Sequence, residues 1–334
     1  MPASSSYAFS SPIPGSVSFE GKPLSSVYPA LRELCDLPCD SAKTVLARSD
    51  LVFAALPHGL SQETAAACDA EGKAFIDLGA DFRLDDPDTY KTWYGCDALY
   101  PALHQKAVYG LPELYAADIA KARLVANPGC YPTASTLGLQ PMLKAGHIVD
   151  NTIVIDAKSG YTGAGRRPAL NKLLTEAENN FCAYALGGGH RHTPEIEQNI
   201  AYITGKDLMK PETWQYINFQ PHLLPQVRGI EVTIYATCDK DFTNEEVYEL
   251  YKDFYKDEPF VKVFPASLPV QTKWVYGTNF CEMTPTFDAR THRLIVSSVI
   301  DNIGKGAAGQ AIQNMNLIMG LPETTGLMMP PMYP

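Results

Sequence analysis

Three short apolar runs in the first part of the chain have the length and character of buried strands. They cover residues 51–56, 74–78 and 124–126. Residues 61–71, between the first two runs, are rich in alanine and favour a helix. Short apolar strands that alternate with helices are typical of a parallel sheet covered by helices. We therefore predict an α/β domain at this end of the chain.

From about residue 151 the pattern changes. Residues 152–157, 229–235 and 293–300 have the pattern of longer strands, and residues 245–255 form a clear helical pattern between two of them. This part predicts a mixed sheet with helices on one side. Residues 306–319 are helical again, and we expect the proline-rich tail after Gly320 to be a surface strap.

The composition agrees with a large globular protein. The chain has 334 residues, of which 46% are hydrophobic and 19% are charged, and this length favours about two domains. No basic leader and no apolar run of about 18 residues is visible, so we expect a cytoplasmic protein with free thiols and no membrane contact.

The net charge of −10 argues against a general nucleic-acid binder, because such proteins carry a basic stripe. An acidic protein that binds an anion must gather its cations locally. The candidates gather in residues 158–167 and 190–192, with Arg228 and Lys305 in addition.

The segment Asn127-Pro128-Gly129-Cys130-Tyr131-Pro132-Thr133-Ala134 carries the most informative residue, Cys130. It follows a predicted strand and precedes a predicted helix over residues 133–143, with Pro132 suited to the first turn. Unpaired N–H groups and the positive end of the helix dipole favour the nucleophilic thiolate, and the same N–H groups can hold an oxyanion. The alternative is a buried cysteine without chemistry at a strand–helix junction.

His190 and His192 stand just before a second predicted helix, for which Thr193 looks like the N-cap and Pro194 the first residue. An imidazole titrates near working pH, so either histidine can serve as a general acid or base. A metal site that includes Glu195 is disfavoured, because no third histidine or cysteine stands at the usual spacing. Two surface histidines beside a helix cap are the remaining alternative.

Three glycine-containing segments are candidates for ligand contact. Residues 158–167 follow a strand and combine glycines with hydroxyl groups and arginines that can clamp an anion. Residues 304–309 match G-x-G-x-x-G, but too few residues follow for a complete dinucleotide-binding unit, so the glycines more plausibly permit close packing to another element or a ligand. Residues 57–59 close a strand of the parallel sheet, where such sheets bind ligands.

Taken together, these motifs resemble the N-acetyl-γ-glutamyl-phosphate reductase family. Eight segments carry the resemblance in the family's order from about Gly21 to the C-terminus. They are residues 55–59, 77–83, 109–113, 127–133, 159–166, 190–196, 221–229 and 301–310.

The resemblance implies an NADP-dependent reductase with a Rossmann-like cofactor domain and an α+β catalytic domain like that of glyceraldehyde-3-phosphate dehydrogenase. We place the cofactor domain at residues 1–129 and 303–334 and the catalytic domain at 130–302. Cys130 would attack the acyl phosphate and expel phosphate, NADPH would reduce the thioester, and N-acetylglutamate 5-semialdehyde would leave. The family also implies a homotetramer or homodimer, while the residue spacing predicts no metal.

The resemblance assigns roles to individual residues. Cys130 and one of His190 and His192 are catalytic, with His192 preferred as the base. The residues expected to contact the substrate are Asn127, Ser159, Gly160, Arg166 and Arg191. Those expected to contact NADP(H) are Pro57, His58, Gly59, Ser159, Gly160, Asn302 and Gly306.

In one respect the sequence departs from the family. Family members begin with a strand, a glycine-rich phosphate loop and a helix, whereas here Gly21-Lys22-Pro23-Leu24 matches the region after the second strand. We therefore predict a cofactor domain without its pyrophosphate loop. Two alternatives stay open: reduction of an aspartyl or aminoadipyl phosphate, and a cofactor-deficient relic with a binding or structural role.

Overall fold

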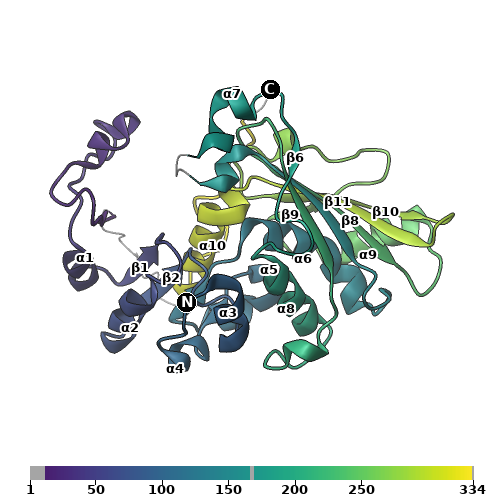
Figure 1. The fold of residues 1–334 in the computed structure, drawn as a ribbon, viewed down its shortest axis with the longest axis horizontal. Helices are drawn as coiled ribbons and strands as arrows, with labels where there is room; N and C mark the ends of the chain where they lie inside the picture. Colours follow the sequence, from purple (N-terminus) through teal and green to yellow (C-terminus); the bar gives the residue numbers. More distant parts are fainter. Residues whose placement is uncertain (1–11, 166–168, 333–334) are drawn as a thin grey trace, which may run out of the picture.

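The computed structural model describes residues 12–165 and 169–332, and it contains two sheets that lie side by side (Figure 1). The strands of the smaller sheet come from the first half of the chain, and the C-terminal helix packs on this sheet. The larger sheet is built from the second half. Residues 12–41 form an arm beyond the smaller sheet, shown in purple in Figure 1.

The smaller sheet is parallel and has the strand order β1-β2-β4-β3. Its strands are β1 (Leu51–Ala54), β2 (Ala74–Asp77), β3 (Val108–Tyr109) and β4 (Leu124–Ala126). The helices of this part are α1 (Ala42–Arg48), α2 (Gln62–Ala70), α3 (Pro87–Tyr94), α4 (Pro101–His104) and α5 (Pro112–Ile119). The three predicted strands and the alanine-rich helix are thus confirmed.

Both faces of the smaller sheet are covered, which explains why its strands are apolar except for Asp77 at the end of β2. On one face, Val52 and Phe75 pack with Ala65 and Cys68 of α2. On the other face, Ile76 and Val125 cluster with residues of α5 and α10 (Gly309–Ile318). A strand buried on both faces has no polar side to expose, so it shows no alternation.

The larger sheet is mixed and has the order β6-β7-β5-β8-β11-β10-β9. Its strands are β5 (Val154–Ser159), β6 (Cys182–Ala183), β7 (Asn218–Leu223), β8 (Ile230–Thr237), β9 (Val261–Val263), β10 (Cys281–Asp288) and β11 (Arg293–Ile300). The helices of this part are α6 (Cys130–Lys144), α7 (Leu174–Ala177), α8 (Thr193–Ile203) and α9 (Asn244–Phe254). The predicted mixed sheet and its long strands are confirmed.

Helices α6, α8 and α9 cover one face of the larger sheet, and the main core lies between them and the strands. Pro141 interrupts the hydrogen bonding of α6, because it has no N–H to offer the carbonyl of Leu137. Tyr255 Oη donates to that carbonyl at 2.6 Å instead. The long helix that begins at Cys130 therefore stays buried without an unpaired carbonyl at this point.

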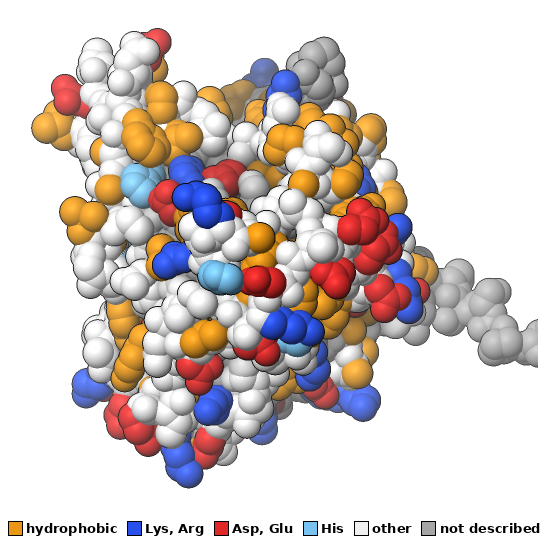
Figure 2. All heavy atoms as spheres, turned by 90° about the vertical axis from the view of Figure 1, so that its right-hand side faces the viewer, with side chains coloured by type: hydrophobic (Ala, Val, Ile, Leu, Met, Phe, Trp, Pro, Cys, Tyr) orange, Lys and Arg blue, Asp and Glu red, His pale blue; other side chains and the backbone are white. Residues whose placement is uncertain are grey.

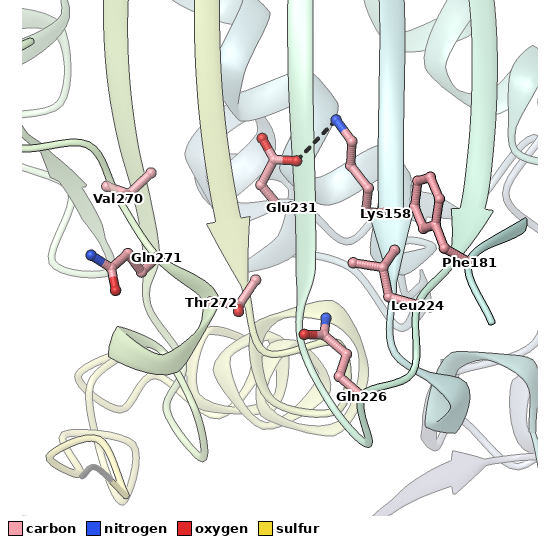
Figure 3. Close-up of a pocket in the computed structure, with 8 residues that line it drawn as sticks. All are labelled: Lys158, Phe181, Leu224, Gln226, Glu231, Val270, Gln271 and Thr272. Atoms are coloured by element: carbon pink, nitrogen blue, oxygen red, sulfur yellow. Dashed lines mark ion pairs between the residues drawn. The ribbon is translucent and has the colours of Figure 1, made fainter. Parts of the chain in front are cut away.

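The other face of the larger sheet is open along β5 and β8. There Lys158 and Glu231 form an ion pair of 3.1 Å in a hollow of about 440 Å³, and their side chains point toward each other (Figure 3). Figure 2 shows that one side of the molecule intermixes Lys and Arg with Asp and Glu, so the acidic excess does not form a single patch on that side.

Three predicted helix starts differ from the structure. α6 begins at Cys130, three residues before the predicted start. α8 begins at Thr193 itself, so the predicted Thr193 N-cap is wrong; His192 is the N-cap and makes no capping bond through its side chain. The last helix is preceded by a π-helical turn, η7 (Gly304–Ala308), and α10 follows it from Gly309.

Candidate functional site

Cys130 is the first residue of α6 and follows β4 by way of the turn at residues 127–129. Its side chain is half-buried. Burial raises the pKa of the thiol to about 11, although hydrogen bonds from the backbone N–H groups of Tyr131 and Cys130 and the charge of Arg83 act to lower it. The helix terminus thus acts in the predicted direction, but the predicted net bias toward thiolate is wrong because desolvation is the larger effect.

His192 lies against the turn that leads to Cys130. A methyl group on Gly129 would lie only 2.6 Å from His192 Nε2, so the imidazole edge occupies the space beside this glycine. Burial holds the pKa of His192 well below its usual value, and the charges around it lower the pKa further. Its Nδ1 is buried and makes no hydrogen bond with any described residue. His192 is therefore a neutral imidazole with an unused polar atom at the site.

His190 occupies a different position. Its Nδ1 accepts a hydrogen bond of 3.1 Å from the backbone N–H of His192, and the two rings are 4.8 Å apart. Burial, and then the charge of Arg191, lowers the pKa of His190 to about 4. The residue therefore supports the loop that carries His192, and only its other ring nitrogen is available for a ligand.

A buried carboxylate, Glu195, fixes the turn before Cys130. Glu195 Oε1 accepts hydrogen bonds from Gly129 N at 2.8 Å and Tyr109 Oη at 2.7 Å. Its Oε2 pairs with Arg83 Nη1 at 3.4 Å, and Arg83 Nε donates to the carbonyl of Asn127 at 2.8 Å. The sequence assigned no site role to Arg83 or Tyr109. Their motifs marked them as family residues, but nothing in a linear pattern shows that they share a buried carboxylate.

Arg191 is exposed and lies at the edge of this group. Its guanidinium stands over the ring of Tyr94 at 5.5 Å, and Tyr94 Oη donates to the Arg191 carbonyl at 3.3 Å. The ring of His58 is 5.1 Å from the same tyrosine. The structure thus joins the loop after β1 to the histidine loop through a side chain of α3 that the sequence did not single out.

The loop at residues 57–59 follows the carboxyl end of β1. Pro57 and His58 are exposed, and Gly59 N donates to Asp81 Oδ1 at 2.7 Å. Partial desolvation of the ring by its neighbours, and then the charge of Arg191, lowers the pKa of His58 although the residue is exposed. The side chains of this loop are therefore accessible, while its backbone is held by the hydrogen bond to Asp81.

Gly306 lies directly against Cys130. A methyl group on it would lie 2.8 Å from Cys130 Cβ. In the neighbouring turn, Asn127 Nδ2 donates to the carbonyl of Ala307 at 3.1 Å and Asn127 Oδ1 accepts from Asn314 at 3.1 Å. Both amide atoms of Asn127 are thus engaged, and a ligand contact by this side chain has to replace one of these bonds.

Ser159, Gly160 and Asn302 form a second group at the carboxyl end of β5. Asn302 Oδ1 accepts from Gly229 N at 2.8 Å and its Nδ2 donates to Thr162 Oγ1 at 3.0 Å. Buried Ser159 donates from its hydroxyl to the carbonyl of Gly160 at 2.9 Å and also interacts with the Tyr131 hydroxyl. This group therefore contacts α6 through the Tyr131 hydroxyl.

The predicted cation cluster is only partly assembled. Lys158 lies on the open sheet face with Glu231, and Lys305 is fully buried with Glu113. Arg228 pairs with Asp301 at 3.7 Å. Arg166 lies outside the described residues. Within the described part of the chain, Arg83 and Arg191 are the arginines whose charges act on His192.

The described residues contain no group of three or more histidine, cysteine, aspartate or glutamate side chains placed to hold a metal ion. In the same described part of the chain, none of the helices combines the length and the apolar character that a membrane crossing requires.

The fold and the thiol site define a semialdehyde dehydrogenase. Residues 5–122 match the semialdehyde dehydrogenase NAD-binding domain, and residues 130–302 match the semialdehyde dehydrogenase dimerisation domain. The same fold occurs in aspartate semialdehyde dehydrogenase II from Vibrio cholerae, with a TM-score of 0.66 and 17% identity over 91% of this chain and 88% of that one. An aspartate semialdehyde dehydrogenase with NADP from Candida albicans has a TM-score of 0.65 and 11% identity, covering 93% and 91% of the two chains. The predicted α/β fold class is thus confirmed.

Sequence relatives specify the family. An N-acetyl-gamma-glutamyl-phosphate reductase from Symbiobacterium thermophilum is 49% identical over 96% of this chain and 91% of its own length. One from Desulforudis audaxviator is 48% identical over 95% and 90%. The chain belongs to the N-acetyl-gamma-glutamyl-phosphate reductase family, as its motifs predicted.

Proposed function

We propose that this chain reduces N-acetyl-L-glutamyl 5-phosphate to N-acetyl-L-glutamate 5-semialdehyde with NADPH, releasing phosphate, as a step of arginine biosynthesis. The observation that carries the proposal is the position of Cys130 at the start of α6, with the His192 imidazole against the preceding residue. The names of the sequence relatives support the same activity. The aspartyl and aminoadipyl alternatives and the relic receive no support from them.

His192 moves the protons in this proposal. Because burial keeps the imidazole neutral, it can accept the proton of Cys130 as the sulfur attacks the acyl carbon and the bond to phosphate breaks. The resulting thioester is reduced to a thiohemiacetal. When the carbon–sulfur bond of that species breaks, the aldehyde forms and His192 returns a proton to the sulfur. Backbone N–H groups at the start of α6 stabilise the oxyanion.

The substrate anion is recognised beside the histidines. We assign this role to Arg191, which is exposed there, and to Asn127, Ser159, Gly160 and Arg166 from the family motifs. His190 supports the His192 backbone and contacts the substrate through its remaining nitrogen. An arginine suits a carboxylate or phosphate because its guanidinium can donate two parallel hydrogen bonds.

The residues at the carboxyl ends of the parallel strands fit a dinucleotide. Exposed Pro57 and His58 flank a loop held by Asp81, and Gly306 leaves no Cβ between η7 and Cys130. These residues would hold the cofactor with Gly59, Ser159, Gly160 and Asn302. When bound, NADPH supplies the hydride that reduces the thioester. The choice of NADP(H) over NAD(H) is part of this proposal.

The assembly and organisation of the molecule follow the family. We propose a cytoplasmic homodimer or homotetramer in which residues 1–129 and 303–334 bind the cofactor and residues 130–302 carry the catalytic chemistry. The match of residues 130–302 to a dimerisation domain supports self-association. The packing of α10 on the smaller sheet supports the division of the chain.

The test is phosphate-dependent reduction of NADP⁺ by this chain with N-acetylglutamate 5-semialdehyde, beside Cys130→Ser. We expect turnover in the wild type and its loss in the variant, which keeps its fold by circular dichroism. Faster turnover of aspartate semialdehyde would contradict the substrate assignment. A calorimetric titration with NADP⁺ tests the cofactor assignment, since we expect saturable binding and a failure of the folded chain to bind would contradict it.

A further inference from the structure

A buried ion pair lies outside the site described above. Lys305 Nζ and Glu113 Oε1 are 2.5 Å apart, and both side chains are fully buried. Lys305 Nζ also donates to Gln313 Oε1 at 2.8 Å. Removing two charges from water is costly, and a buried pair is often no more stabilising than apolar residues of the same volume. The ion pair is therefore expected to act by positioning the elements that it joins.

Lys305 belongs to the π-helical turn η7. Gly306 N donates to the carbonyl of Asp301 at 3.0 Å, and Ala308 N donates to the carbonyl of Ile303 at 2.8 Å. Each bond therefore joins residues five apart in sequence, as in a π-helix. Such a turn is rare, occurs frequently at functional sites and is not stabilised by regular helix geometry. The side chain of Lys305 is one anchor that fixes it from the inside.

The turn η7 packs against Cys130. Gly306, next to Lys305, is so close to Cys130 that a methyl group would lie 2.8 Å from the cysteine Cβ. The carbonyl of Ala307 receives the Asn127 amide at 3.1 Å. A displacement of η7 therefore changes two contacts: the packing of Gly306 against Cys130 and the hydrogen bond to Asn127 in the turn before Cys130.

Glu113 connects the same pair to the helix of the nucleophile. It lies in α5, and its backbone carbonyl accepts a hydrogen bond of 3.0 Å from Gln140 Nε2 of α6. One end of the ion pair thus belongs to the turn above Cys130, and the other end is bonded to the helix that Cys130 begins.

We propose that Lys305 and Glu113 are positioning residues that clamp η7 over Cys130. The inference rests on the proposed role of Cys130 as nucleophile. Neither residue touches the reacting atoms. The clamp keeps the thiol covered and keeps the approach to it in the geometry that turnover requires.

The test removes both charges together, because Lys305→Met alone would leave Glu113 buried and unpaired and could prevent folding. In Lys305→Met/Glu113→Leu we expect kcat to fall about 30-fold or more while KM for the semialdehyde changes less than about threefold, since binding groups remain and alignment is lost. We expect alkylation of Cys130 by iodoacetamide to become about fivefold faster or more, because the loosened turn uncovers the thiol.

The matched control is Lys262→Met/Glu282→Leu, which removes an ion pair of 3.1 Å between β9 and β10, neither member of which belongs to η7 or α5. Both rates should match the wild type in this control. Unchanged kcat and alkylation in the Lys305/Glu113 variant would overturn the inference, and so would losses that only follow the unfolded fraction measured by thermal unfolding. The alkylation comparison needs no substrate. It therefore still tests the clamp if the proposed reaction is wrong.

Discussion

The contact between Gly129 and His192 allows the proposed proton transfer to be tested by a single methyl group. The backbone at Gly129 has φ −70° and ψ 153°, which alanine adopts freely, so Gly129→Ala introduces no backbone strain. Its methyl group would lie 2.6 Å from His192 Nε2 and 3.0 Å from Arg83 Nη1. The substitution therefore acts through these side chains alone.

The size of the effect follows from that distance. Ordinary contact begins at 3.4 Å, so the imidazole must retreat by about 0.8 Å if the methyl group stays in place. A displacement of about 1 Å in a catalytic group can cost 10²-fold in rate. We expect kcat/KM to fall about 10- to 100-fold, equivalent to about 1.4–2.7 kcal/mol of lost transition-state stabilisation.

The assay is the phosphate-dependent reduction of NADP⁺ with N-acetylglutamate 5-semialdehyde, normalised to folded protein. Gly138→Ala is the matched control, because its methyl group would lie 2.6 Å from Ile234 Cδ1, deeper in the same helix. That substitution crowds the core as strongly but lies about 12 Å along α6 from the thiol. A kcat/KM for Gly129→Ala within about threefold of the wild type, or an equal loss in both variants, would refute the placement of His192 as the proton carrier.

Two further predictions follow from the surroundings of the site. The unfolded chain protonates His190 near pH 6.5, whereas the folded chain does so only near pH 4, so stability is lost as the pH falls. Between pH 6.5 and 5 this contributes about 2 kcal/mol, and His190→Gln should flatten the decline in urea unfolding by that amount; an equally steep decline would contradict it. Asp81 accepts hydrogen bonds from Gly59 N at 2.7 Å and Ser61 N at 3.0 Å, so Asp81→Asn should loosen the loop after β1. We expect KM for NADP⁺ to rise about tenfold with Cys130 alkylation unchanged, and an unaltered KM would exclude the loop from cofactor binding.

The type of each sheet was predictable, because the hydrophobic pattern of a strand depends on whether one or both faces of its sheet are covered. Strands β2 and β4 are buried on both faces and appear as continuous apolar runs. Strands β5 and β8 have one open face and alternate along their length. Each pattern follows from burial, which the sequence encodes locally.

The supports of the thiol could not be predicted in the same way. Glu195 bonds to Gly129, Tyr109 and Arg83, residues that are far from it in sequence. A first-turn glutamate usually complements its own helix terminus, and the residue pattern is the same when the carboxylate serves another turn instead. The choice is made by tertiary packing of α8 against α6, which no local pattern records.

The pKa of Cys130 shows a second limit of reasoning from sequence. The helix start and its N–H groups were visible in the Pro-Gly-Cys pattern, and they do lower the pKa. The opposing desolvation depends on how closely Gly306 and the surrounding side chains cover the thiol. Gly306 comes from the opposite end of the chain, so the local sequence around Cys130 could not reveal the desolvation that raises the thiol pKa.

A covered thiol of raised pKa still suits the proposed reaction. A thiolate of higher pKa is a stronger nucleophile once formed, so the site gains reactivity if the proton leaves as the carbon–sulfur bond forms. The same property makes the sulfur a poor leaving group when the thiohemiacetal breaks, and a proton must then be returned to it. Both steps require a group that exchanges protons with Cys130 in each direction, and neutral His192, beside the residue before the thiol, is placed to do so. In the proposed mechanism the high thiol pKa and the need for His192 are therefore linked, because a thiol that stays protonated at neutral pH needs a proton acceptor when it attacks its substrate.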